Sequence, residues 1–276
     1  MAGAFLHPLT CLPHYSQAMH TFSDSKSPSG VFNIRSSGSE GRPVLFLAGP
    51  PVSSLLFRGV QERMAPQRTL AVDFVPGKCG SDLKAMAAAL GRLCETEDVQ
   101  MLVAHGLAVP VALAAGGGGI HTVVISNGPT SKLDPVSAFL SKCPAKILEK
   151  LVFNPSFSTA WLASSVGLRR TVANPYVMDR ETVEVLTQDV LKDSNSRAQA
   201  AVWLRGLPDI LPVELPHDLN VVALWGDGDR FYPVDNVANN EAMSVRSVPG
   251  GRFFYPQERP WEMADACLEM IKKSGL

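Results

Sequence analysis

Two proton-transfer groups stand at the ends of apolar runs that have the pattern of buried strands. His105 directly follows MLVA (101–104), and Asp229 comes shortly after NVVALW (220–225). Imidazole and carboxylate side chains are the common general acids and bases of enzymes. Arg252, just after two glycines near the end of the chain, offers a planar cation that can bind a carboxylate. Side chains of these types could transfer protons or bind an acidic ligand, and the family resemblance given below singles out these three residues.

Each of these candidates also has a purely structural interpretation. Asp229 and Arg252 could form an internal ion pair, which would hold the fold together without touching a ligand. His105 could be a buried side chain that only supports the turn after it. The sequence leaves these alternatives open.

The elements that must position these residues alternate between short apolar runs and longer helical patterns. Between residues 132 and 216 the pattern is helical throughout, with no strand periodicity. This order predicts an α/β fold, with a mostly parallel doubly wound sheet and an inserted helical cap. Ligands of such sheets bind at the carboxyl ends of the strands, here beneath the cap. The expected strands are VFNI (31–34), VLFLA (44–48), TLAVDF (69–74), MLVA (101–104), TVVIS (122–126), NVVALW (220–225) and SVRSV (244–248).

The chain divides accordingly into an arm, a core and a cap. Residues 1–30, rich in Ser, Pro and His, are expected to form an irregular N-terminal arm. Residues 31–131 and 217–276 should form the core, and residues 132–216 the cap. The two strands that flank the cap should then be parallel neighbours in one sheet.

The charge balance and the apolar pattern argue against two classes of partner. The 276 residues include 25 basic and 26 acidic side chains and only 7% aromatic residues, so nothing suggests a nucleic-acid surface. The stretch 99–131 has no Asp, Glu, Lys or Arg and is long enough to span a bilayer. Pro110 and the run Gly116–Gly119 interrupt it, however, and it fits buried strands of a parallel sheet better. No nucleic-acid and no membrane partner is therefore expected.

The cysteines give no sign of a metal or redox centre. Their spacing matches neither a zinc site nor a redox pair, and we expect no metal and no cofactor. Isolated thiols favour a reducing, cytoplasmic setting. The five residues are Cys11, Cys79, Cys94, Cys143 and Cys267.

Four segments, in the family's own order, resemble the α/β-hydrolase fold with a cap inserted after the sixth strand. The resemblance covers residues 30–276. It implies a strained G-x-S-x-G turn that presents a nucleophilic serine, a histidine base, an acid and a pair of oxyanion N–H donors. The segments are VLFLAGPP (44–51), RTLAVDFVPGKCGSD (68–82), MLVAHGLAVPVALA (101–114), and VVALWGDGDRFYP (221–233) together with VPGGRFFYPQERPWEMA (248–264).

The nucleophile and the base implied by this resemblance are missing. Gly106 stands at the serine position, and a glycine cannot attack a carbonyl. Arg252 stands at the histidine position, and a guanidinium stays protonated and cannot act as a base. Asp229 matches the family's acid. Ordinary serine-hydrolase chemistry is therefore excluded.

The oxyanion segment is altered as well. Gly49 is followed by Pro50 and Pro51, and proline has no N–H to donate. The N–H of Leu107 is then the donor that is left. The residues expected to bind the ligand are Arg252, Gly49, Pro50, Pro51, Gly106, Leu107, Phe231 and Phe253.

The altered triad is similar to that of serine-less α/β-hydrolase-fold epimerases of ribosomal-peptide natural-product pathways. This similarity implies a non-hydrolytic enzyme that acts by proton transfer or isomerisation on a small peptide or metabolite beneath the cap, with Asp229 and His105 as catalytic residues. The alternative is a catalytically inactive pseudo-hydrolase that binds a ligand or serves as a scaffold. A third interpretation is a hydrolase with a relocated nucleophile, Ser53 or Ser54, although both serines are expected to be helix or turn caps.

Overall fold

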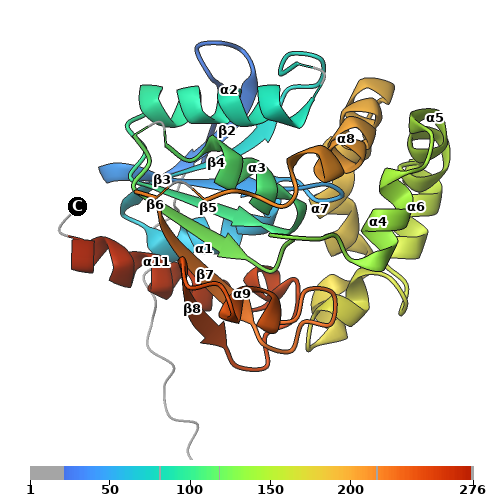
Figure 1. The fold of residues 1–276 in the computed structure, drawn as a ribbon. Helices are drawn as coiled ribbons and strands as arrows, with labels where there is room; N and C mark the ends of the chain where they lie inside the picture. Colours follow the sequence, from blue (N-terminus) through green and yellow to red (C-terminus); the bar gives the residue numbers. More distant parts are fainter. Residues whose placement is uncertain (1–21, 81, 118, 216, 275–276) are drawn as a thin grey trace, which may run out of the picture.

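The computed structural model describes residues 22–80, 82–117, 119–215 and 217–274 (Figure 1). In this part of the chain, eight strands form one sheet in the order β1-β2-β4-β3-β5-β6-β7-β8. Strand β2 is antiparallel to both of its neighbours, and all other pairs are parallel. The strands are β1 (Ser23–Lys26), β2 (Phe32–Ser37), β3 (Glu40–Ala48), β4 (Gln67–Phe74), β5 (Met101–His105), β6 (Thr122–Ser126), β7 (Asn220–Gly226) and β8 (Met243–Val248).

Helices cover both faces of the sheet, so its central strands are apolar on both sides. Every residue of β5 and β6 is buried. Helices α2 (Leu83–Thr96) and α3 (Val109–Ala115) lie on one face, and α1 (Arg58–Met64) and α11 (Pro260–Ser274) lie on the other (Figure 1). The uncharged stretch that was long enough for a membrane span is thus β5, α3 and β6 inside the core, as predicted.

None of the described helices has both the length and the apolar character needed to cross a membrane.

The segment between β6 and β7 forms the cap, which lies beyond the carboxyl ends of the strands (Figure 1). Its helices begin after Asp and Asn residues whose side chains accept backbone N–H bonds, as at Asp134, Asn154, Asp179 and Asp193. The flanking strands pair in parallel, which confirms the expected neighbours. The cap elements are α4 (Pro135–Ser141), α5 (Ala145–Ile147), the π-helical turn η3 (Leu148–Val152), α6 (Pro155–Leu162), η4 (Leu168–Thr171), η5 (Pro175–Met178), α7 (Arg180–Leu191), α8 (Ser194–Gly206) and η6 (Leu207–Ile210).

The N-terminal region differs from the expectation in one respect. Ser23–Lys26, within the expected irregular arm, is an edge strand that pairs antiparallel with β2. The expected edge strand 31–34 therefore has neighbours on both sides. The rest of the expected arm, residues 1–21, lies outside the described residues.

Candidate functional site

The turn after β5 has a left-handed backbone conformation at residue 106, which is a glycine and has no side chain. Gly106 has a φ of +62°, in the left-handed region that favours glycine. It connects β5 directly to the 3₁₀ turn η2 (Gly106–Ala108) and to α3. Gly128, after β6, approaches it so closely that a Cβ atom there would lie 2.2 Å from the Gly106 carbonyl oxygen. A side chain at residue 106 would therefore require a backbone conformation that L residues rarely adopt.

Phe253 faces Gly106 from the loop after β8. A Cβ atom built on Gly106 would lie 3.0 Å from Phe253 Cζ. The Phe253 ring also packs against the His105 ring, with centroids 4.9 Å apart, and against Phe254 at 4.7 Å. An aromatic ring therefore covers Gly106 and lies beside His105.

Arg252 does not face the turn, which differs from the sequence comparison that aligned it with the catalytic histidine. Its Nη1 donates to the carbonyl oxygens of Val172 at 3.0 Å and Arg170 at 3.3 Å. These bonds tie the last loop to the cap. Arg252 was expected to bind the ligand, with an ion pair to Asp229 as the alternative. In this structure it bonds to cap carbonyls and is not among the described lining residues of the cavity.

Gly106→Ser is expected to produce no esterase. The new hydroxyl would meet the Phe253 ring and no general base, and a non-glycine residue in the left-handed region costs about 1–2 kcal/mol. Stopped-flow assays with a nitrophenyl ester should show no burst, and thermal unfolding should show a lower Tm. Gly77→Ser is the matched control, because Gly77 has a φ of +75° with open space at its Cβ position. A burst equal to the protein concentration would contradict the expectation.

Asp229 follows β7, and its side chain is hydrogen-bonded to the side-chain amide of Asn127. Its Oδ2 accepts a bond from Asn127 Nδ2 at 2.8 Å, and its Oδ1 accepts one from the Phe231 N–H at 2.8 Å. The Asn127 side chain also accepts from the Gly226 N–H at 2.9 Å and donates to the Gly226 carbonyl oxygen at 3.2 Å. Sequence reasoning missed Asn127, although its position directly after the β6 strand was a usable signal.

Burial sets the protonation of Asp229. Its side chain is buried, and this raises its pKa from 3.8 to about 6, against the opposing effect of the bonds from Phe231 and Asn127. The folded state therefore binds the proton more tightly than the unfolded chain, and this residue makes stability fall as pH rises from about 4 to about 6.

Asp229→Asn is expected to remove that part of the pH dependence. The raised pKa corresponds to about 3 kcal/mol of stability lost between pH 4 and pH 7. The asparagine side chain does not ionise, so the variant does not lose this stability as pH rises. Urea unfolding at several pH values should give a flatter profile for Asp229→Asn than for the wild type. Asp235→Asn, at an exposed carboxylate, should keep the wild-type slope. Parallel profiles for wild type and Asp229→Asn would contradict the expected role of burial.

His105 belongs to a buried hydrogen-bond chain that does not include Asp229. Ser126 Oγ donates to Tyr255 Oη at 3.1 Å, and Tyr255 donates to the Leu224 carbonyl oxygen at 3.2 Å. Because the one Ser126 proton is used in this way, its oxygen must accept from His105 Nδ1 at 3.1 Å. Burial lowers the pKa of His105 to about 3, so the imidazole is neutral. The two expected catalytic residues therefore do not share a hydrogen bond.

The two serines considered as relocated nucleophiles are buried beside the sheet. Ser54 Oγ donates to Asp73 Oδ2 at 2.5 Å, and the Ser54 N–H donates to the other carboxylate oxygen at 2.9 Å. Neither Ser53 nor Ser54 is among the described residues that line the cavity under the cap. Ser53 precedes the 3₁₀ turn η1 (Ser54–Phe57), but its buried hydroxyl makes no cap bond and has no hydrogen-bond partner among the described residues. The expected capping role of the two hydroxyls is therefore not seen, since Ser54 binds Asp73 instead.

A cavity of about 240 Å³ lies between the strand ends and the cap. Its wall includes the predicted Gly49, Pro50, Pro51, His105, Gly106, Leu107, Phe231 and Phe253, which the fold brings together. Asp229 and Arg252 are not among its described lining residues. The cap supplies the remaining apolar surface through Val136, Leu140, Val152, Phe153, Trp161, Leu162, Val166 and Leu168.

Among the described lining residues, His105 carries a buried ring nitrogen, Nε2, that has no hydrogen-bond partner. Asp134 caps α4 and accepts the Tyr232 hydroxyl at 2.8 Å. Arg170 is exposed, and its guanidinium lies over the Phe231 ring, 5.1 Å from the centroid. Among the described lining residues these are the two with formal charges, so Arg170 is the cation that a ligand would meet. The described residues contain no group of three or more His, Cys, Asp or Glu side chains that could hold a metal ion.

Solved α/β-hydrolase-fold structures match almost the whole chain. A structure of wild-type Cfl2 from Burkholderia cenocepacia has a TM-score of 0.71 at 21% identity and covers 90% of this chain and 95% of that chain. The epoxide hydrolase CorEH has a TM-score of 0.69 at 17% identity, with coverages of 92% and 99%. A thermophilic esterase from Thermogutta terrifontis has a TM-score of 0.66 at 16% identity, with coverages of 93% and 99%.

These likenesses, at low sequence identity, show the fold alone. The protein has the α/β-hydrolase fold, as the sequence predicted. No protein-family model matches the sequence, and no curated protein matches it.

Proposed function

We propose that the protein binds a small, mostly apolar molecule with an anionic end in the cavity under the cap, without forming an acyl-enzyme. The observation that carries this proposal is the Phe253 ring, which covers Gly106 and completes an apolar wall. Because the Phe253 ring covers Gly106, the structure favours ligand binding over hydrolysis as the function. The free thiols of Cys79, Cys94, Cys143 and Cys267 support a reducing, cytoplasmic setting as part of the proposal.

The size and lining of the cavity define the ligand. Its volume of about 240 Å³ is below the range of about 300–1,000 Å³ that holds drug-sized molecules, which favours a short chain or a single ring system. Burial of apolar surface supplies about 25 cal/mol per Å², so an aliphatic body gives most of the affinity. Arg170 at the wall suits a carboxylate at one end of that body.

A pair of ligands that differ only in the end group tests this proposal. Isothermal titration calorimetry should show saturable one-site binding of both decanoate and decanol, with decanoate binding more tightly. Fluorophosphonate labelling of any serine would contradict the absence of an acyl-enzyme. A lack of saturable binding by both ligands would contradict the proposed ligand class.

Arg170→Gln is expected to weaken decanoate binding by about fivefold and to leave decanol binding unchanged. The factor is modest because Arg170 is exposed, and exposed ion pairs contribute about 1 kcal/mol at most. The same titrations measure it. Arg205→Gln, at an exposed arginine on α8, is the control and should bind both ligands like the wild type. An equal loss for both ligands would show that Arg170 does not contact the carboxylate.

The second candidate function is proton transfer, of the kind carried out by the serine-less epimerases. A pKa of about 6 would let Asp229 both take and give a proton near neutral pH. This function requires the substrate to reach a carboxylate that is not among the described lining residues of the cavity. Incubation with candidate peptides in D₂O tests it: deuterium should enter an α-carbon with the wild type and not with Asp229→Asn. If no candidate peptide shows exchange, the proton-transfer function is contradicted and ligand binding is the proposal that remains.

A further inference from the structure

The outer surface of the cap exposes large apolar side chains. We call this surface the cap face, and it consists of Phe139, Ile147, Leu151, Phe157, Trp161 and Val166. Phe139 is 69% exposed, Leu151 61% and Phe157 60%. Phe157 and Trp161 lie four residues apart on α6, and Ile147 and Leu151 lie four apart on α5 and η3, so each pair shares one side of its helix. Large apolar side chains exposed on several elements of the cap are typical of an interaction surface.

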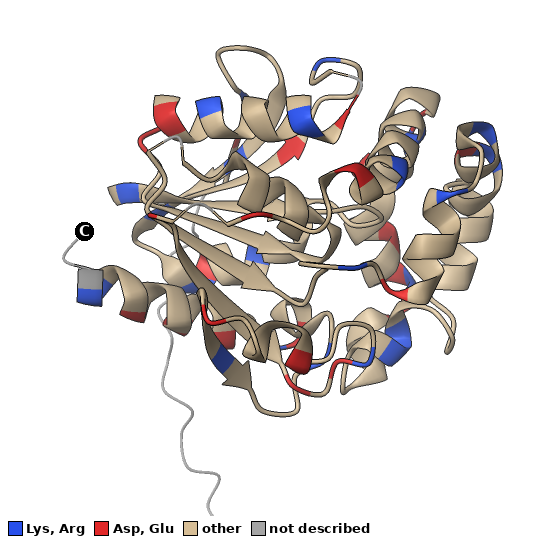
Figure 2. Cartoon of the chain, in the orientation of Figure 1, with Lys and Arg blue, Asp and Glu red and all other residues tan. Residues whose placement is uncertain are grey.

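Basic side chains accompany the cap face. Lys142, Lys146 and Lys150 are exposed on the same helices. The segment 135–170 contains five basic residues and one acidic residue, whereas the whole chain has a net charge of −1. Blue segments recur on these outer helices in Figure 2. The charge of the chain is thus unevenly distributed, with a cationic excess where the apolar side chains are exposed.

The cavity reaches the cap face. Val136, Trp161 and Val166 line the cavity and are also exposed, at 52%, 45% and 59%. Arg170 lines the cavity and is exposed as well. These residues therefore mark a mouth where an apolar cavity meets an apolar, cationic surface.

We propose that the cap face docks on the surface of an anionic lipid bilayer and that the apolar ligand enters the cavity from the bilayer through this mouth. This proposal departs from the sequence-based expectation of no membrane partner, because the exposure of these apolar side chains is seen only in the structure. Aromatic and aliphatic side chains flanked by lysines are the composition of elements that lie in a membrane interface. Lysines near the surface of an anionic leaflet add electrostatic attraction. A second copy of the chain fits less well, because two cap faces would bring like charges together. The entry of the ligand rests on the proposed binding function, whereas the docking does not.

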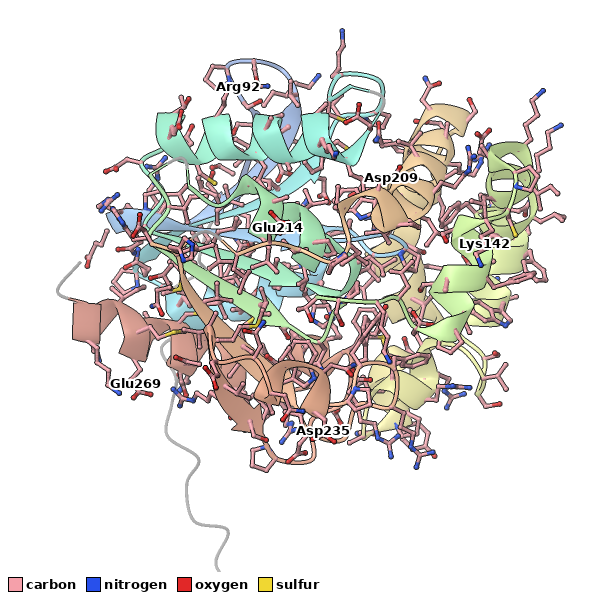
Figure 3. All side chains as sticks on the ribbon, viewed as in Figure 1. Arg92, Lys142, Asp209, Glu214, Asp235 and Glu269 are labelled. Carbon is pink, nitrogen blue, oxygen red and sulfur yellow. The ribbon has the colours of Figure 1, made fainter. Side chains whose placement is uncertain are left out.

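Vesicle flotation tests the apolar part of the proposal. The wild type should float with phosphatidylcholine vesicles that contain phosphatidylglycerol and much less with phosphatidylcholine alone. The variant Phe139→Ser/Phe157→Ser/Trp161→Ser should bind about tenfold more weakly. Trp261→Ser is the matched control, because Trp261 is 46% exposed and lies on α11. Figure 3 labels Glu269 on α11 and Lys142 on the cap at opposite sides of the molecule.

Charge reversal tests the electrostatic part. Lys142→Glu/Lys146→Glu/Lys150→Glu should abolish the preference for phosphatidylglycerol, and high salt should weaken wild-type binding. The control Lys26→Glu/Lys84→Glu/Lys272→Glu reverses three exposed lysines elsewhere and should keep most of the binding.

Each remaining outcome overturns the docking proposal. In flotation, these outcomes are a wild type that does not float and a serine variant that floats like the wild type. In light scattering, the outcome is a wild-type dimer that is lost in the serine variant. In peptide titration, it is binding of an acidic amphipathic peptide by a protein that does not bind vesicles. Decanoate titration in vesicle-free solution is run in parallel. Its failure contradicts the proposed ligand class, and its success with failed flotation contradicts the docking alone.

Discussion

Asn127→Ala is expected to lower the free energy of unfolding by about 3–5 kcal/mol at neutral pH. The substitution removes three bonds at once: those to the Asp229 carboxylate, the Gly226 N–H and the Gly226 carbonyl. Each buried group left without a partner costs about 1–3 kcal/mol. Asn127 also has a φ of +38°, a conformation that asparagine tolerates better than alanine. Urea unfolding with a linear extrapolation measures the change.

A double-mutant cycle with Asp229→Asn separates the carboxylate contact from the backbone bridge. If the Asn127 amide stabilises the protein through Asp229, the losses in unfolding free energy of the two single variants should be clearly non-additive. Asn239→Ala, at an exposed asparagine, should change stability by less than about 0.5 kcal/mol. A loss below about 1 kcal/mol for Asn127→Ala would show that this amide does not hold the acid in place.

Leu140→Trp is expected to weaken decanoate binding by about tenfold or more. Leu140 is half-buried on α4 and lines the cavity, so the larger indole would occupy the space that the ligand needs. A tenfold loss corresponds to about 1.4 kcal/mol of binding free energy. Calorimetric titration measures it, and thermal unfolding checks that the variant is folded.

Leu268→Trp provides the control for this cavity-filling test. Leu268 is also a half-buried helical leucine, but it packs on α11 against the other face of the sheet. The control should bind decanoate like the wild type. Equal binding by Leu140→Trp and the wild type would place the ligand outside the cavity.

Most of the fold could be predicted from the sequence because the central strands are buried on both faces. Continuous apolar runs such as TVVIS (122–126) arise only where both sides of a strand are covered, and β6 has this environment. The edge strand β1 gave no such signal, because all four of its residues are exposed. Its pairing with β2 depends on backbone hydrogen bonds, which leave no apolar pattern.

The site was predicted in part, and the error at Arg252 has a physical cause. Side chains in an irregular loop after a strand do not alternate with a fixed period. If the loop is aligned with an error of one residue, a different side chain is placed facing inward. Phe253 rather than Arg252 therefore meets Gly106. Asp229 was found because its segment, VVALWGDGDRFYP (221–233), resembles the family's acid-bearing segment. Its amide partner Asn127 comes from a segment 102 residues away. Contacts between such distant segments require the three-dimensional fold.

The cap was the least predictable region. Its helices are short, so helical periodicity alone does not show which side of each helix is buried. Trp161 lines the cavity and is nevertheless 45% exposed. The wide apolar exposure of the cap therefore became visible only in the structure.

The most direct test of the central proposal is a calorimetric titration of the wild-type protein with decanoate at two temperatures. The proposal predicts saturable binding at one site with a negative heat-capacity change, because apolar surface is removed from water. The absence of saturable heat, or binding with no heat-capacity change, would contradict an apolar ligand site under the cap.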